Sequence, residues 1–138
     1  MRKYTPDDIE SLNDNQIFVF GANSKGIHGK GAALLAKTKF GAKQGQSEGL
    51  QGQSFGVITK KNWRVEKSST LSEIGYGLLK MINFSKSNPE KEMIVTKLGS
   101  SLAGYTVDEI KGLFQIIENK IGIPENVILP KEYEVRKN

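Results

Sequence analysis

The chain has 138 residues, of which 37% are hydrophobic and 25% are charged, a composition typical of one globular domain. It contains no cysteine and one histidine, which excludes disulfides, thiolate metal sites, cysteine nucleophiles and histidine-rich metal sites. No apolar run approaches the roughly 20 residues of a membrane-spanning helix, and the first residues lack the apolar core of a signal peptide, so the sequence predicts a cytoplasmic protein.

The positive charge is concentrated in one segment. The net charge is +5, and residues 23–67 carry nine lysines and arginines against only Glu48 and Glu66. Acids outnumber bases before this segment, and the two are balanced after it. Such a field attracts the phosphates of a nucleotide or of a nucleic acid. A solvated basic surface would have the same composition.

The N-terminal residues predict a helix and then a strand. Thr5-Pro6-Asp7-Asp8 has the residue order of a helix N-terminus, with a cap, a proline and acids in the first turn. We therefore expect a short helix that ends near Leu12. Residues 17–20 are a β-prone apolar run, which predicts a buried strand.

A second helix and a second strand are expected next. From Gly31 the sequence favours a helix, with Leu34, Leu35 and Thr38 available for one face. Residues 41–53 are rich in glycine and glutamine and predict a loop. The sequence "SFGVITK", residues 54–60, predicts the next strand.

The second half of the chain continues this alternation. Residues 68–70 offer an N-cap for a helix that ends at Asn88-Pro89, and residues 93–97 predict a third strand. Thr106 and Glu109 have the spacing of a capping box for another helix. The apolar residues at helical spacing in these two helices are Leu71, Ile74, Leu78 and Ile82, and Ile110, Leu113, Phe114 and Ile117.

The chain ends on a turn, a short strand and a charged tail, and the whole pattern predicts a fold class. The last strand is expected at residues 127–130 and the tail at about residues 131–138. Strands that alternate with helices predict an α/β layered domain.

Three loops are candidates for a ligand site. They follow the first three predicted strands, at residues 21–30, 60–69 and 98–105. If these strands are parallel neighbours, the loops meet at their carboxyl edge, where α/β folds bind ligands. Glycines let backbone N–H groups face a phosphate, and a following helix adds the positive end of its dipole.

Two nucleotide-binding signatures are absent from the first loop. A Rossmann fingerprint needs a third glycine where this chain has Leu34, and Gly29-Lys30-Gly31 lacks the Ser or Thr of a P-loop. Hydrolysis of ATP by P-loop chemistry is therefore not expected.

Three segments resemble macro domains, the ADP-ribose-binding α/β/α modules. "GANSKGIHGKGAALLAKTKFG", residues 21–41, is similar to their first ligand loop. "VITKKNWR", residues 57–64, resembles the strand and loop of the branch that removes ADP-ribose from glutamate or DNA bases. "VTKLGSSLAGYTVDEI", residues 95–110, resembles their second phosphate loop. The segments occur in family order within residues 16–117. The chain is also similar to small phage and prophage proteins with an "IFVFGSN…HGAGAA" opening.

The resemblance implies a three-layer α/β/α sandwich with a mixed sheet over residues 1–138. It also implies a site for ADP-ribose or a related NAD-derived nucleotide, free or attached to protein or nucleic acid, with no metal and no cofactor. Asn23 and Tyr105 would lie near the distal ribose, and the backbone of Gly29 and Gly31 at the diphosphate. The residues implied to contact the ligand are Ala22, Asn23, His28, Gly29, Lys30, Gly31, Gly99, Ser100, Ser101, Leu102, Ala103, Gly104 and Tyr105.

The implied catalytic residue is Lys60, which matches the lysine that attacks or positions the distal ribose in the ADP-ribose-removing branch. That branch has an acid where this chain has Ala103, and another branch has an Asp where this chain has Ala33. The nearest acid is Asp108, in the first turn of a predicted helix. A lysine without a general acid or base is a weak catalyst. We therefore expect nucleotide binding with weak or absent removal of ADP-ribose.

Other interpretations of these residues remain open. Asn23 also fits a turn cap, His28 a hydrogen-bond donor within the loop, and Lys60 a solvated strand end. Trp63 fits either stacking on an adenine or anchoring its loop, and residues 41–53 either cover the ligand or form a plain flexible loop. The alternative functions are a basic nucleic-acid-binding module, which would have few aromatic residues for stacking, and a phage-type interaction protein without nucleotide affinity.

Overall fold

A five-stranded mixed sheet forms the centre of the molecule, in the computed structural model that describes residues 3–62, 64–98 and 103–137. The strand order is β2-β3-β1-β4-β5. All neighbouring strands are parallel except β2, which pairs antiparallel with β3 at one edge. The strands are β1 (Gln16–Asn23), β2 (Gly49–Gln51), β3 (Ser54–Lys60), β4 (Glu92–Val95) and β5 (Val127–Ile128).

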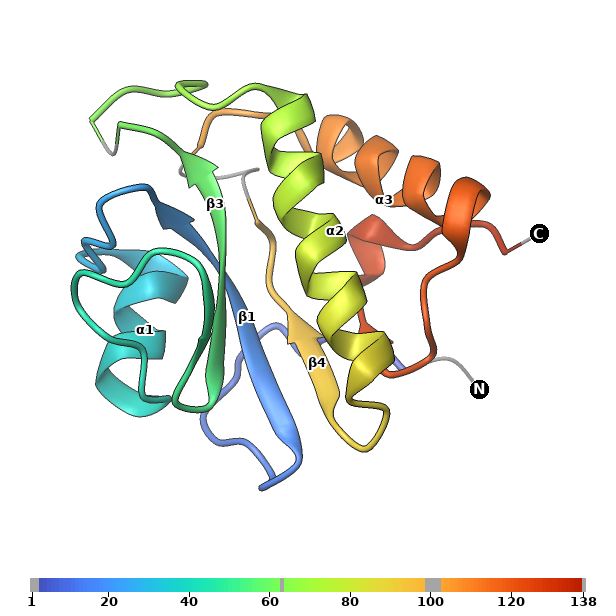
Figure 1. Ribbon diagram of the computed structural model, residues 1–138, viewed down its shortest axis with the longest axis horizontal. Helices are drawn as coiled ribbons and strands as arrows, with labels where there is room; N and C mark the ends of the chain where they lie inside the picture. Colours follow the sequence, from blue (N-terminus) through green and yellow to red (C-terminus); the bar gives the residue numbers. More distant parts are fainter. Residues whose placement is uncertain (1–2, 63, 99–102, 138) are drawn as a thin grey trace.

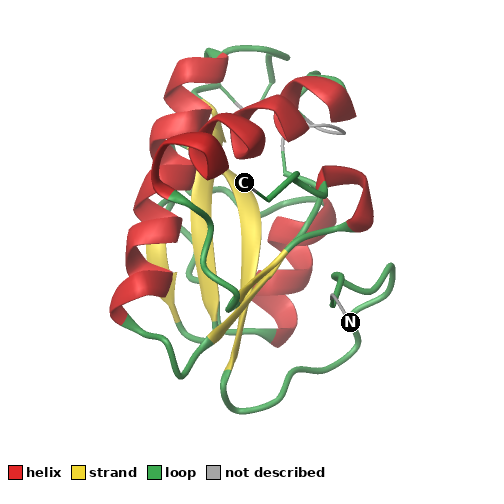
Figure 2. Ribbon diagram, turned by 90° about the vertical axis from the view of Figure 1, so that its right-hand side faces the viewer, coloured by secondary structure: helices red, strands yellow, loops and turns green. Residues whose placement is uncertain are grey.

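Helices cover both faces of the sheet. In Figures 1 and 2, α1 (Gly31–Lys39) lies on one face, and α2 (Leu71–Ser87) and α3 (Val107–Ile121) lie on the other. A single 3₁₀ turn, η1 (Lys131–Tyr133), follows β5. The predicted three-layer α/β/α sandwich with a mixed sheet is confirmed. The strands expected at residues 17–20, 54–60 and 93–97 are present as β1, β3 and β4, and the three helices expected after them are present as α1, α2 and α3.

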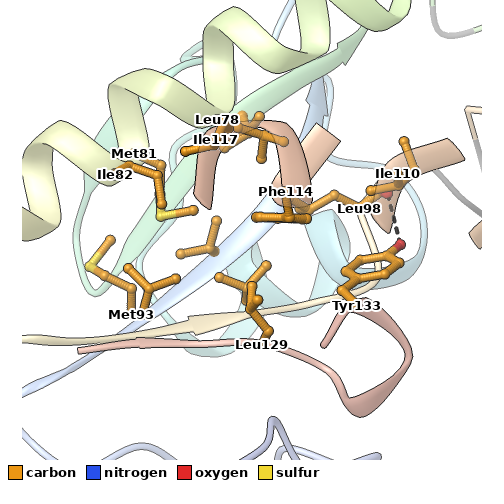
Figure 3. Packing of buried hydrophobic residues seen from close by; sticks show 14 of the residues in the cluster. Leu78, Met81, Ile82, Met93, Leu98, Ile110, Phe114, Ile117, Leu129 and Tyr133 are labelled. Atoms are coloured by element: carbon orange, nitrogen blue, oxygen red, sulfur yellow. Dashed lines mark hydrogen bonds between the residues drawn. The ribbon is translucent and has the colours of Figure 1, made fainter. Parts of the chain in front are cut away.

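The alternation of side chains along β1 divides the apolar core between the two faces. Ile17 and Val19 belong to a large cluster under α2 and α3, whereas Phe18 and Phe20 pack in a smaller cluster with α1. Figure 3 shows part of the large cluster. The smaller cluster is closed by alanines and by Phe40, whose ring lies 5.0 Å from that of Phe18.

The helix expected between Thr5 and Leu12 is not formed. The Thr5 N–H donates to the carbonyl of Leu129, and its hydroxyl donates to the carbonyls of Val95 (2.7 Å) and Ile128 (3.1 Å). These bonds hold the Thr5 backbone and side chain against the ends of β4 and β5. The segment therefore crosses the sheet as irregular chain.

Two expectations about the next segment are corrected. Leu34 is 40% exposed and Thr38 is exposed, because α1 packs through Ala36, Leu35 and the alanines of its first turn. Residues 41–53 are not wholly loop, since they include the edge strand β2. The signal for β2 is weak, because the strand is three residues long and contains Gly49 at a φ of +83°.

The charged tail expected at residues 131–138 is instead part of the core over residues 133–135. Tyr133 is completely buried, stacks on Phe114 with ring centres 5.6 Å apart, and donates its hydroxyl to the carbonyl of Leu98 at 3.0 Å (Figure 3). Val135 is buried beside it. Charged neighbours on both sides hide these two apolar residues in the sequence.

Candidate functional site

Three loops meet at the carboxyl edge of the parallel strands β3, β1 and β4, the upper edge in Figure 1. The loops after β1 and β3 stay paired beyond the strands, because the Ser24 N–H donates to the carbonyl of Lys60 at 2.9 Å and its hydroxyl donates to that of Lys61 at 2.5 Å. Asn23 and Lys60 are partners in register at the ends of their strands. The predicted meeting of the loops is therefore confirmed.

Asn23 uses its side chain to shape the loop after β1. Its carbonyl oxygen accepts the N–H groups of Lys25 (3.2 Å) and Ile27 (3.0 Å), and its amide donates to the carbonyl of Ile27 at 2.7 Å. This is an Asx-type turn, in which a side chain replaces backbone partners. Ala22, just before it, is buried beneath α1.

His28 is fully buried and joins two loops. Its Nε2 faces the carbonyls of Lys43 (2.9 Å) and Gln46 (3.0 Å), so this nitrogen carries the proton and donates to both. The ring meets Phe20 edge-on at 5.2 Å. The Gly45 N–H also donates to the carbonyl of Gly26. The Gly/Gln-rich segment is thus fastened to the first loop.

The N-terminus of α1 is exposed and carries no cap. Its N-cap residue, Lys30, makes no side-chain capping bond, and its first turn has no acid. By contrast, Thr70 and Thr106 close α2 and α3 with complete capping boxes. The free N–H groups and the positive dipole end of α1 therefore face solvent beside exposed Gly29. Such a terminus is a ready-made anion site.

The two glycines of this loop differ in what the fold requires. Gly31 has a φ of +56°, which favours glycine for conformational reasons. Gly29 has no such φ, and a Cβ built on it would meet no atom within 4 Å among the described residues. The fold thus leaves open space at Gly29, next to the uncapped helix end.

The loops after β3 and β4 are tied together. The Lys67 N–H donates to the carbonyl of Ala103 at 2.7 Å, and the Tyr105 hydroxyl donates to that of Ser69 at 2.6 Å. Ala103 and Tyr105 are buried. Four implied contact residues and the aromatic residue of the middle loop lie outside the described residues: Gly99, Ser100, Ser101, Leu102 and Trp63.

A basic hollow at this edge was not predicted from the sequence. It has a volume of about 310 Å³ and is lined by Lys25, Lys61, Asn62 and Arg64. Lys61 forms an ion pair of 2.7 Å with Glu73, and this hydrogen bond is the main reason why the pKa of the Glu73 carboxyl lies below its usual value. The sequence did contain a signal for this hollow, because Lys25 and residues 61–64 follow two strands that were expected to be neighbours.

A hollow with a mixed lining lies on the other side of α1. Its volume is about 440 Å³. Ile9, Phe18, Ala32 and Leu35 form its apolar part, and Asp7, Thr96, Lys97 and Glu132 are among its polar and charged residues. A larger hollow of about 710 Å³ lies away from the three loops, along β5 and residues 123–125.

Neither a metal centre nor a membrane span is found among the described residues. No three histidine, aspartate or glutamate side chains gather there in a way that could hold a metal ion. No described helix is both long enough and apolar enough to cross a bilayer.

No family model, curated protein or solved structure matches the chain. The resemblance to macro domains therefore depends on the sequence motifs.

Proposed function

We propose that this cytoplasmic protein binds ADP-ribose or a related NAD-derived nucleotide at the carboxyl edge of β3, β1 and β4. The observation that carries the proposal is the uncapped N-terminus of α1, which follows a glycine-rich loop within the basic segment. A helix end of this kind offers N–H groups and a positive dipole to a diphosphate. Open space at Gly29 supports a close approach of the ligand to the backbone.

The surroundings of this helix end suit the rest of a nucleotide. The apolar part of the hollow beside Ala32, at Phe18 and Leu35, can take a flat base, and the polar lining residues Asp7, Thr96, Lys97 and Glu132 can bond to its edge. The lysines of the segment supply long-range attraction for the phosphates.

Removal of ADP-ribose is weak or absent in this proposal. Lys60 stands at the end of β3 beside Asn23, but position 103 carries a buried alanine in place of the acid. The loss of one acid–base group costs about 10²–10⁴ in rate. Wild-type protein should therefore release little ADP-ribose from modified protein or DNA, and turnover at ordinary enzyme rates would contradict this part.

Calorimetry with ADP-ribose tests the binding itself. We expect a 1:1 complex with wild-type protein and at least tenfold weaker binding by Gly29→Val, because a branched side chain would fill the ligand's path. Gly112→Val, in the open on α3, is the matched control and should bind normally. Absence of heat up to millimolar ADP-ribose would overturn the proposal, and normal binding by folded Gly29→Val would remove this loop as the site.

The basic hollow favours a second candidate function, nucleic-acid binding. Three cations around Asn62 can contact successive phosphates. Affinity for DNA or RNA that falls steeply with salt concentration, without any affinity for ADP-ribose, would favour this candidate.

A further inference from the structure

Glu66 is the one acid within the three loops at residues 21–30, 60–69 and 98–105. Of the acids in the first turns of the neighbouring helices, Glu73 and Glu109 complete the capping boxes of α2 and α3, and Asp108 lies on the first turn of α3. Glu66 is exposed and makes no hydrogen bond or ion pair with any described residue. The exposed Glu66 carboxylate can therefore accept hydrogen bonds from a ligand at this basic edge of the sheet.

The backbone around Glu66 is held in an uncommon conformation. Lys67 has a φ of +54° and is the non-glycine residue with a positive φ among the described residues. This conformation costs free energy for a side chain with a Cβ. The bond from the Lys67 N–H to the carbonyl of Ala103 holds it in place. The turn therefore fixes Glu66 against the loop that follows β4.

The Glu66 side chain packs against the backbone of Gly104. A Cβ at position 104 would lie 2.9 Å from the Cβ of Glu66 and 3.0 Å from its Oε2, so the carboxylate rests on the glycine backbone. Gly104 also has a φ of +91°. Two left-handed residues on two loops thus hold one carboxylate between the loops that follow β3 and β4.

Electrostatics decides which part of a nucleotide fits this carboxylate. It repels a diphosphate, but its two oxygens can accept hydrogen bonds from two neighbouring hydroxyl groups. Acidic residues bind ribose hydroxyls in this way in dinucleotide sites. We propose that Glu66 accepts hydrogen bonds from a ribose diol of the bound nucleotide and so makes the site select a ribosylated diphosphate. This inference rests on the proposed function.

The inference is tested by whether substitution of Glu66 weakens or strengthens the binding of ADP-ribose. Glu66→Gln and Glu66→Ala remove a negative charge, so a carboxylate without sugar contacts predicts tighter binding of every diphosphate. The diol contact predicts weaker binding of ADP-ribose by calorimetry, about tenfold or more for Glu66→Ala. Pyrophosphate, which has no sugar, should bind both variants at least as well as wild type.

Glu90→Gln is the matched control, because Glu90 is exposed in a turn just before β4, at the opposite edge of the sheet. It should leave ADP-ribose affinity unchanged. Folded Glu66 variants that bind ADP-ribose as tightly as wild type, or more tightly, would overturn the inference while the proposed function stands. Wild-type protein that binds no ADP-ribose would overturn both.

Discussion

Asn23 and His28 build the first loop from within. The amide of Asn23 is bonded to Lys25 and Ile27, and the imidazole of His28 to the carbonyls of Lys43 and Gln46. The positions that resemble ligand contacts thus hold their own loops in shape. In the proposed site, a ligand would therefore meet chiefly the backbone that these side chains have arranged.

The burial of His28 leads to a stability prediction. His28→Ala should lower the free energy of unfolding by about 2–4 kcal/mol, because it leaves a cavity and deprives two carbonyls of their donor. Urea denaturation followed by circular dichroism measures this loss. Lys30→Ala, at an exposed residue, is the control. A His28→Ala value within about 0.5 kcal/mol of wild type would contradict the structural role.

The sequence predicted the positions of Asn23 and Lys60 in the fold better than it predicted the contacts of His28 and Glu66. The positions of Asn23 and Lys60 at adjacent strand ends follow from the order of the elements. The hydrogen-bond partners of His28, the carbonyls of Lys43 and Gln46, lie 15 and 18 residues further along the chain. They are in a segment without periodicity, so the sequence around His28 did not predict its burial. The position of Glu66 against Gly104 depends on two loops that are distant in sequence.

At the scale of secondary-structure elements, the sequence predicted a helix end correctly where all of the bonding groups lie within a few residues. The capping boxes of α2 and α3 were predictable, because a Thr and a Glu three residues apart satisfy each other's backbone groups. The helix expected after Thr5 did not form, because Thr5 is instead held by tertiary bonds to the carbonyls of Val95, Ile128 and Leu129.

The contrast between helix ends gives a second prediction. Thr106→Ala should lower the free energy of unfolding by about 1 kcal/mol, the usual value of a side-chain cap. Lys30→Ala at α1 should change it by less than half as much, since Lys30 caps nothing. Urea denaturation of both variants measures the difference, and equal losses would contradict the assignment of α1 as uncapped.

The caps also predict a dependence on pH. Hydrogen bonds with Thr106 hold the pKa of the Glu109 carboxyl below its usual value of 4.5. A lowered folded pKa means that its stabilisation is present above pH 4.5 and is lost as the pH falls below it. Glu109→Gln keeps a hydrogen-bond acceptor but cannot titrate. Its free energy of unfolding should fall less steeply than that of wild type between pH 6 and 3, and identical slopes would refute the assignment.

At the scale of the whole molecule, the C-terminal residues complete the core, and Tyr133 bonds to the loop that follows β4. The alternation of elements predicted the α/β class and the adjacent parallel strands. The alternation did not predict that Tyr133 packs on Phe114 and bonds to Leu98, because Tyr133 lies between charged residues in the sequence. The bond to the Leu98 carbonyl also fixes the start of the loop that follows β4.

Tyr133 therefore matters for the entire fold. Tyr133→Ala should lower the free energy of unfolding by about 3–5 kcal/mol, as for other large aromatic residues in cores. Tyr133→Phe retains the packing and loses the hydrogen bond to the Leu98 carbonyl, so its free energy of unfolding should fall by about 1 kcal/mol. Thermal and urea denaturation compare the two. Near-wild-type stability of Tyr133→Ala would mean that residues 131–137 are a dispensable tail.

The central claim is that ADP-ribose binds across the uncapped end of α1. Titration of ADP-ribose into ¹⁵N-labelled protein, followed through the amide signals, tests both the binding and its place. We predict the largest shifts at Gly29 and in the first turn of α1, at Gly31 and Ala32. No shifts at millimolar ligand, or the largest shifts along the hollow at Val127, would contradict the claim.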